Sequence, residues 1–165
     1  MPKTQSVSVA LEIARTQQIL KKSATQKLPL LGEGVLYDPE ILKSGREAVE
    51  GLVLSVPWFA EAENSKEFAN KANEKWGGHI SYRTAGNYDA TQAFIKAISM
   101  SAENPSRQNV LKNLRSINLS PSETSGNPLQ FDNNGERQQE PVLVKVVRGS
   151  GGPQDSGFKF EQVPE

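Results

Sequence analysis

The sequence predicts an α/β fold, and three observations support this prediction. Residues 28–57 have the pattern of a strand, a glycine-rich loop, a short helix and a second strand. The second strand, at 52–56, is a continuous apolar run, which is typical of a strand covered on both faces in a parallel sheet. Several later segments repeat apolar residues at helical spacing. A chain of 165 residues is long enough to form a domain with a hydrophobic core.

Composition and charge exclude several classes of function. Lys+Arg and Asp+Glu both number 19, so no net positive field is available to attract nucleic acid. The chain has no cysteine, which excludes disulfides, thiolate metal sites and cysteine nucleophiles. His79 is the only histidine, so histidine metal clusters and histidine-dependent triads are disfavoured. We therefore expect neither an enzyme nor a bound metal or cofactor.

The sequence also bears on membrane insertion and export. No apolar run approaches the roughly 20 residues of a membrane span. Residues 1–14 lack the apolar core and the cleavage site of a signal peptide. We therefore expect either a cytosolic protein or a sequence whose export signal lies upstream of Met1.

The first elements follow from apolar spacing and glycine placement. A helix is expected over 6–23, with one buried side. A short strand is expected at 28–31, and then a loop in which Gly32 and Gly34 flank Glu33. The buried face of the helix would consist of Val7, Ala10, Leu11 and Ala14.

The next unit runs from a helix to the apolar strand. Asp38 followed by Pro39 is typical of an N-cap and a first helical residue, which predicts a helix over 39–45. The strand at 52–56 comes next and ends at Pro57. This order predicts half of a parallel α/β unit.

Three further helices are expected. Asn64 and Glu67 have the spacing of a capping box, and Gly77 with Gly78 would end that helix. Residues 79–83 would then be a short strand or an ordered loop. The clearest helix would begin near Asp89, whose carboxylate would stabilise the positive end of the helix dipole. Its core face would be Ala90, Ala93, Phe94, Ala97 and Ile98.

The last third of the chain predicts one more helix and then strands. Asn104 with Pro105 would cap a helix whose core face is Val110, Leu111 and Leu114. Asn133-Asn134-Gly135 is a strong turn signal between 129–132 and 141–147, which predicts an antiparallel ribbon. Phe158 and Phe160 alternate with polar residues, as in a final edge strand.

Four of these segments together resemble the type I periplasmic binding proteins, the receptors for leucine, isoleucine, valine and related amino acids that supply ABC transporters. VSVALEIARTQQILKK is similar to a helix of the family's second lobe, and LPLLGEGVLYDPEIL with EAVEGLVLSVPW to its strand, ligand loop and lobe-crossing strand. NYDATQAFIKAI resembles a tyrosine-containing helix of the first lobe. GNPLQFDNNGERQQEPVLVKVV resembles the family's ribbon near the C-terminus.

The resemblance implies a partial type I fold, with Rossmann-like three-layer α/β/α lobes, crossover strands and a C-terminal β ribbon. It assigns residues 1–57 to the second lobe, 58–140 to the first lobe, and 141–165 to a crossover strand and the second-lobe tail. The family's first half, with its export signal, has no counterpart here. The complete protein would be periplasmic and would bind an ABC permease.

The resemblance and the α/β pattern suggest four ligand-contacting residues. Amino-acid receptors of the family place an acid in the loop occupied by Glu33, where it pairs with the ligand ammonium. Without a one-residue gap, Gly34 takes this position, and Glu33 would be an exposed loop residue. Tyr37 would pack on the ligand or cover the short helix. Trp58 would contact the ligand or brace the hinge between lobes.

These features predict a solute-binding module for an amino acid or a similar small molecule, closing by a hinge without chemistry on the ligand. A ligand-sensing receptor domain of the same fold is an alternative. A truncated product without independent binding is another, because Val53, Val56, Phe94 and Ile98 would then lack part of their cover and favour self-association. We expect this chain alone to bind amino acids weakly or not at all.

Overall fold

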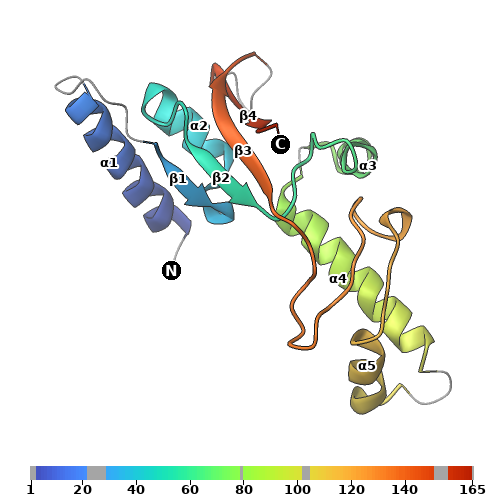
Figure 1. Ribbon diagram of the computed structural model, residues 1–165. Coiled ribbons are helices and arrows are strands. Elements are labelled where there is room, and N and C mark those ends of the chain that lie inside the picture. The colour runs from blue at the N-terminus through green and yellow to red at the C-terminus, as the bar shows by residue number, and fades with distance from the viewer. Residues whose placement is uncertain (1–2, 22–28, 79, 102–104, 151–155, 165) are drawn as a thin grey trace. The chain divides into compact units, whose positions relative to one another are not determined.

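The computed structural model describes residues 3–21, 29–78, 80–101, 105–150 and 156–164. Helices and short strands alternate in the first half, and two longer strands come at the end (Figure 1). The α-helices are α1 (Lys3–Lys21), α2 (Pro39–Gly45), α3 (Lys66–Trp76), α4 (Tyr82–Ser99) and α5 (Arg107–Leu114). The strands are β1 (Leu31–Glu33), β2 (Val53–Val56), β3 (Val142–Arg148) and β4 (Phe158–Gln162). The 3₁₀ helices are η1 (Gly34–Leu36), η2 (Arg46–Ala48) and η3 (Pro121–Glu123).

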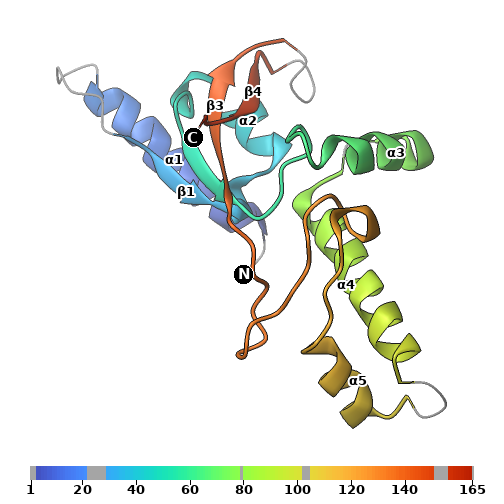
Figure 2. The same cartoon turned by 45° about the vertical axis from the view of Figure 1, so that its right-hand side comes forward.

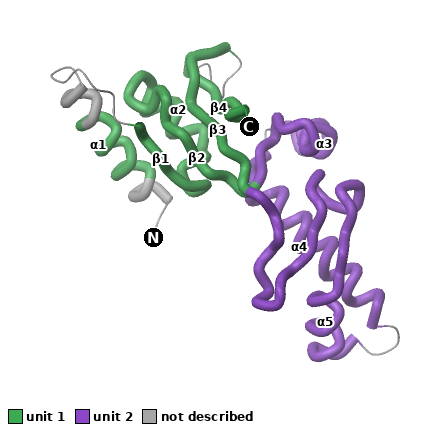
Figure 3. Tube along the Cα trace, viewed as in Figure 1, with its two compact units in different colours: residues 1–57, 141–165 green, residues 58–140 purple. Residues whose placement is uncertain are grey.

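The chain divides into two compact units (Figure 3). Unit 1 comprises residues 1–57 and 141–165, and unit 2 comprises residues 58–140. The correspondence of the three expected segments to the lobes of a larger fold stays a prediction.

Unit 1 is built on a four-stranded sheet in the order β1-β2-β3-β4. The pairing of β1 with β2 is parallel, as the strand–helix–strand pattern predicted, and the other two pairings are antiparallel. The first strand lies at 31–33 and not at 28–31, and residue 28 lies outside the described residues. Gly32 permits this strand to pack closely, because a Cβ there would lie 2.8 Å from the Leu36 side chain and 2.9 Å from that of Leu54.

The core of unit 1 lies between its helices and the sheet. α1 lies alongside α2 and η1 (Figure 2). Its inner face was predicted well, since Val7, Leu11 and Ala14 are buried, although the helix spans 3–21 and residues 22 and 23 lie outside the described residues. The fully buried side chains of this core include Ile41, Leu42, Leu54, Val56, Val144 and Val146.

α2 confirms its sequence signal. The helix spans Pro39–Gly45, and the Asp38 carboxylate accepts a hydrogen bond from the Glu40 backbone N–H at 3.1 Å. Asp38 as the N-cap and Pro39 at the first helical position are the two features that the sequence predicted.

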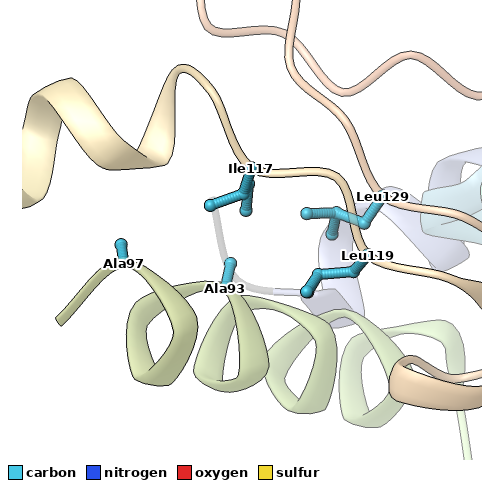
Figure 4. Close-up of a cluster of buried hydrophobic side chains, with 5 residues drawn as sticks. All are labelled: Ala93, Ala97, Ile117, Leu119 and Leu129. Carbon is cyan, nitrogen blue, oxygen red and sulfur yellow. The ribbon is translucent and has the colours of Figure 1, made fainter. Parts of the chain in front are cut away.

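Unit 2 packs α4 and α5 against an irregular segment around 117–131. A cluster of small and branched side chains lies between them (Figure 4), and Val110, Leu114 and Phe131 pack against it. The members of the cluster are Ala93, Ala97, Ile117, Leu119 and Leu129. Alanines on α4 allow the irregular segment to approach the helix closely.

Two helix starts in unit 2 differ from the predictions. α4 begins at Tyr82, so the described residues of 79–83 do not form a strand; His79 lies outside the described residues. Asp89 therefore lies within the helix and not in its first turn. The capping box at α3 is also wrong: Asn64 instead donates its side-chain amide to the Asn127 side chain.

The end of α3 and the start of α5 are each defined by one residue. Gly77 has a left-handed backbone (φ 69°) and ends α3 as predicted. The predicted cap of α5 at Asn104 and Pro105 is wrong: the helix begins at Arg107, and Ser106 caps it by accepting a hydrogen bond from the Asn109 N–H at 3.3 Å. Asn104 itself lies outside the described residues.

The predicted core faces of the helices are partly wrong. α4 buries Ala85, Asp89, Ala93 and Ala97, whereas Phe94 and Ile98 are 51% and 47% exposed. These two residues do lack cover, as the fragment hypothesis expected. Val56, which was expected to lack cover too, is fully buried by the sheet core of unit 1.

The turn at 133–135 forms as predicted, but the ribbon does not. Asp132 accepts hydrogen bonds from the N–H groups of Asn134 and Glu136, each at 2.8 Å. Phe131 and Arg137 form an isolated antiparallel β-bridge, so the pairing across this turn extends over only a few residues. Residues 142–148 pair with β2 and β4 instead, because their apolar side chains belong to the core of unit 1.

Candidate functional site

The parallel pair β1 and β2 brings two strand ends to one edge of the sheet of unit 1. Glu33, the last residue of β1, is paired in register with Ser55. Val56, the last residue of β2, is paired with Val142, the first residue of β3. The chain therefore leaves unit 1 and re-enters it at the same edge that carries Glu33. In parallel α/β sheets, this carboxyl edge is the usual place for ligands.

Glu33 is exposed at this edge. Its backbone is extended (φ −119°, ψ 174°), and it immediately precedes η1. Its side chain does not cap η1, and within the described residues no ion pair involves it. A carboxylate held in this way can accept charge-assisted hydrogen bonds from an ammonium group. Its contact with a ligand stays a prediction.

Gly34 and Tyr37 follow Glu33 in the same segment. Gly34 begins η1, and its carbonyl accepts a hydrogen bond from the Tyr37 N–H at 3.0 Å. The Tyr37 ring is half-buried and lies 4.8 Å from the Phe160 ring of β4, at a tilt of 59°. The segment 33–37 is thus part of β1 at Glu33 and packs against β4 through Tyr37. A ligand role for either residue stays a prediction.

Trp58 begins unit 2 and is buried within it. The indole is 3% exposed, and its Nε1–H donates to the Ser125 carbonyl at 3.0 Å. Its ring meets Phe68 edge-on at 6.3 Å, and Phe68 lies 4.8 Å from Tyr88. The structure brings Glu33, Gly34 and Tyr37 together, and places Trp58 in a separate aromatic cluster of unit 2. Its contact with a ligand also stays a prediction.

Substituting Trp58 with phenylalanine measures what this packing contributes. We expect a loss of about 1–2 kcal/mol in the free energy of unfolding, because the Ser125 carbonyl loses its donor while most of the aromatic contact is retained. Chemical denaturation followed by circular dichroism measures this. A loss near zero would contradict the importance of the indole hydrogen bond.

Sequence reasoning missed a buried polar network centred on Asp89. The Asp89 side chain is 1% exposed and accepts three hydrogen bonds. The donors are the Ser125 N–H at 2.6 Å, the Ser125 hydroxyl at 2.9 Å and the Arg137 Nη1 at 2.7 Å. Because Ser125 also accepts from Trp58, Asp89 fixes the loop that holds the indole.

Only one nitrogen of the Arg137 guanidinium takes part in this network. Its Nη1 is paired with Asp89, while its buried Nε and Nη2 have no hydrogen-bond partner within the described residues.

The Glu123 carboxylate accepts hydrogen bonds from the N–H and hydroxyl of Ser120, which lower the pKa of Glu123. These contacts tie Glu123 to Ser120 at the start of the loop 120–127.

Metal binding and membrane insertion find no support in the described part of the chain. Among the described residues, no three histidine, cysteine or acidic side chains are grouped so that they could hold a metal ion. Nor does any helix described here have the length and apolar character needed to cross a membrane.

Comparison with known sequences finds a protein family whose profile matches most of this chain. The sequence profile described as "periplasmic binding protein" matches residues 3–153. No curated protein sequence matches the chain.

The chain spans about two fifths of the length of three solved structures that have a similar fold. The leucine-binding protein LivK of Thermotoga maritima matches with a TM-score of 0.72 and 22% identity, over 94% of this chain and 41% of its own. A putative branched-chain amino acid ABC transporter from Rhodospirillum rubrum matches with a TM-score of 0.62 and 20% identity, over 85% and 39%. An ABC transporter substrate-binding protein from Desulfitobacterium hafniense, in complex with Leu, matches with a TM-score of 0.61 and 18% identity, over 86% and 37%.

Proposed function

Because this chain belongs to the periplasmic binding protein family, we propose that it is the portion of an amino-acid receptor that presents Glu33 to the ligand ammonium. The complete receptor delivers its solute to an ABC permease. The family is one of binding proteins, and no chemistry is done on the solute. The family also implies an extracytoplasmic location for the complete protein.

The observation that carries this proposal is the position of Glu33. The residue lies at the carboxyl edge of the parallel pair β1 and β2, exposed and without an ion-pair partner among the described residues. The same edge, where Val56 pairs with Val142, is followed by both connections to unit 2, at 57–58 and 140–141. A ligand bound there would be close to the residues about which a hinge would turn.

An amino acid with an apolar side chain is the solute class that the comparisons favour. A leucine-binding protein, a branched-chain amino acid transporter component and a Leu complex are among the similar structures. The part matched here is about two fifths of the length of these chains, and we expect the complete receptor to supply further contacts to the ligand. We therefore expect binding by this chain alone to be weaker than millimolar.

The proposal is tested by titrating the full chain with leucine and following backbone amide resonances by NMR. We expect residues 33–37 to shift, with an affinity reduced about tenfold or more in Glu33→Gln, because one charge-assisted hydrogen bond is lost. Glu12→Gln, which removes an exposed carboxylate on α1, is the matched control and should leave the shifts unchanged.

A ligand control separates the role of the ammonium from that of the apolar side chain. 4-Methylpentanoate keeps the side chain and carboxylate of leucine but lacks its ammonium, so its binding should not distinguish Glu33→Gln from the parent chain. If leucine shifts other residues but not 33–37, or if Glu33→Gln binds leucine as well as the parent, Glu33 is not the ammonium partner. Submillimolar binding to the monomer would show that the site is complete in this chain.

A further inference from the structure

The chain passes between its two units twice, and both connections are short. In the first, Pro57 alone separates Val56, the last residue of β2, from the buried Trp58 of unit 2. Proline has a fixed φ, which removes one of the few rotations available there. The second passes from Glu140, the last residue of unit 2, to Pro141, directly before β3. The contacts that hold these segments within unit 2 therefore decide how freely each connection turns.

Within unit 2, the first connection is anchored on the loop that contains Ser125. Trp58 donates its indole N–H to the Ser125 carbonyl at 3.0 Å, directly after the connection. Further on, the Asn64 side chain donates to that of Asn127, and Gly126 approaches the Asn64 backbone too closely to admit a Cβ. Whatever positions this loop therefore also positions the first connection.

The second connection is anchored through Arg137, shortly before Glu140. The Arg137 Nη1 donates to the Asp89 carboxylate at 2.7 Å. The next residue, Gln138, donates its backbone N–H to the Gln130 carbonyl at 3.0 Å. The segment that leads out of unit 2 is thus held to the irregular part of the unit by its backbone, and to α4 by the Arg137 side chain.

The Asp89 carboxylate joins these two anchors. One of its oxygens accepts the Ser125 N–H at 2.6 Å, and the other accepts the Ser125 hydroxyl at 2.9 Å and Arg137. Because the Asp89 side chain is buried, solvent does little to weaken these charge-assisted hydrogen bonds. A continuous path of hydrogen bonds therefore leads from one connection to the other, through Trp58, Ser125, Asp89 and Arg137.

We propose that Asp89 couples the two connections, so that they turn together and not independently. In unit 1 the connections follow paired residues, Val56 and Val142. They are thus held side by side by the sheet at one end and joined by the Asp89 network at the other. Two short links joined at both ends bend together but resist twisting.

The coupling assigns a role to Asp89 and Arg137 in a receptor that closes by a hinge. They are positioning residues, which confine closure to one path by making both connections turn at once. This consequence rests on the function proposed above. The coupling itself does not depend on a solute or on Glu33, so its test contains no ligand.

The absence of cysteine from the chain permits spin labels at chosen positions. One pair of substitutions, Lys43→Cys with Lys112→Cys, places labels at exposed positions on α2 of unit 1 and α5 of unit 2. A second pair, Lys75→Cys with Lys112→Cys, places both labels within unit 2. Double electron–electron resonance measures the width of the distance distribution for each pair. The first width reports the range of orientations of the units, and the second reports the integrity of unit 2.

The path is broken at either end. Arg137→Met removes the cation that faces Asp89, and Trp58→Phe removes the donor to Ser125 directly after Pro57. Uncoupling adds a twisting motion to the bending motion; if their amplitudes are similar, the mean-square displacements add, and the width between units should rise about 1.4-fold in either variant. The double variant should be no wider than the single variants, because a path broken once transmits nothing further.

Two further variants serve as controls. Arg137→Lys should keep the parent width, since only one nitrogen of Arg137 bonds to Asp89 and an ammonium group can replace it. Lys96→Met also removes a cation paired with an acid in unit 2, the exposed Glu123, but lies outside the path. It should leave both widths unchanged. In every variant the width within unit 2 should equal that of the parent, which also confirms folding.

Three results would overturn the proposal. An unchanged width between units in both Arg137→Met and Trp58→Phe would mean that the path does not restrain the connections. An equal widening within unit 2 would mean that the variants loosen the unit itself. A double variant wider than either single variant would mean that each connection is held independently, without coupling through Asp89.

Discussion

Asp89→Ala is expected to lower the free energy of unfolding of unit 2 by about 3–5 kcal/mol, which is the usual result of removing one partner of a buried ion pair. The substitution leaves three buried donors, two on Ser125 and one on Arg137, without their acceptor. Trp58 and Trp76 both belong to unit 2, so tryptophan fluorescence during urea unfolding measures this unit specifically.

Two further variants make the result specific. Asp89→Asn keeps the shape of the side chain and one acceptor oxygen for Ser125 but removes the charge that faces Arg137, so its loss should be smaller. Glu67→Ala removes an exposed partner of Lys71 and should leave the urea midpoint close to that of the parent. If Asp89→Ala unfolds at the same urea concentration as the parent, the network does not stabilise unit 2.

Elements whose signals are local were predictable from the sequence. The N-cap at Asp38 and the proline after it define the start of α2, and Gly77 defines the end of α3. In each case the deciding interaction lies within a few residues. The apolar run at 52–56 likewise predicted a strand, and β1 pairs with it in parallel as expected. Cover on both faces is only partly confirmed, since Leu54 and Val56 are buried but Val53 is partly exposed.

The role of Asp89 was not predictable, because its partners are distant in the sequence. Ser125 and Arg137 lie 36 and 48 residues further along the chain. The first residues of α4, Tyr82–Asn87, are mostly polar and include Gly86, so the sequence contains no clear signal for a helix there. The prediction therefore began the helix near Asp89 and placed this residue in its first turn. The period of α4 was correct, but its buried face is displaced by one residue, toward Asp89, Ala93 and Ala97. Only the fold determines which of two apolar faces is covered.

The candidate site was predictable only where its signals are local in the sequence. A glycine-flanked acid after a strand indicated a loop at a carboxyl edge, and Glu33 does lie at that edge. The meeting of Val56 with Val142 there was not predictable, since it depends on antiparallel pairing between residues far apart in the sequence. The sequence instead favoured pairing of 141–147 with the nearer segment 129–132.

Gly126→Ala is expected to destabilise unit 2 by about 3 kcal/mol or more, from backbone strain together with a steric clash. Gly126 has a φ of 112°, and a Cβ there would overlap the backbone carbonyl of Asn64. Relieving the overlap would displace the loop that carries Ser125 from both Trp58 and Asp89. The loss is measured by urea unfolding with tryptophan fluorescence.

Gly135→Ala is the matched control for this substitution. Gly135 also has a positive φ, of 86°, but a Cβ there would meet nothing within 4 Å. Strain alone should then cost about 1 kcal/mol. The difference between the two alanine variants isolates the cost of the close approach between Gly126 and Asn64. Equal losses in both variants would mean that the loop yields freely, and that the contacts of Asp89 and Trp58 do not hold it in place.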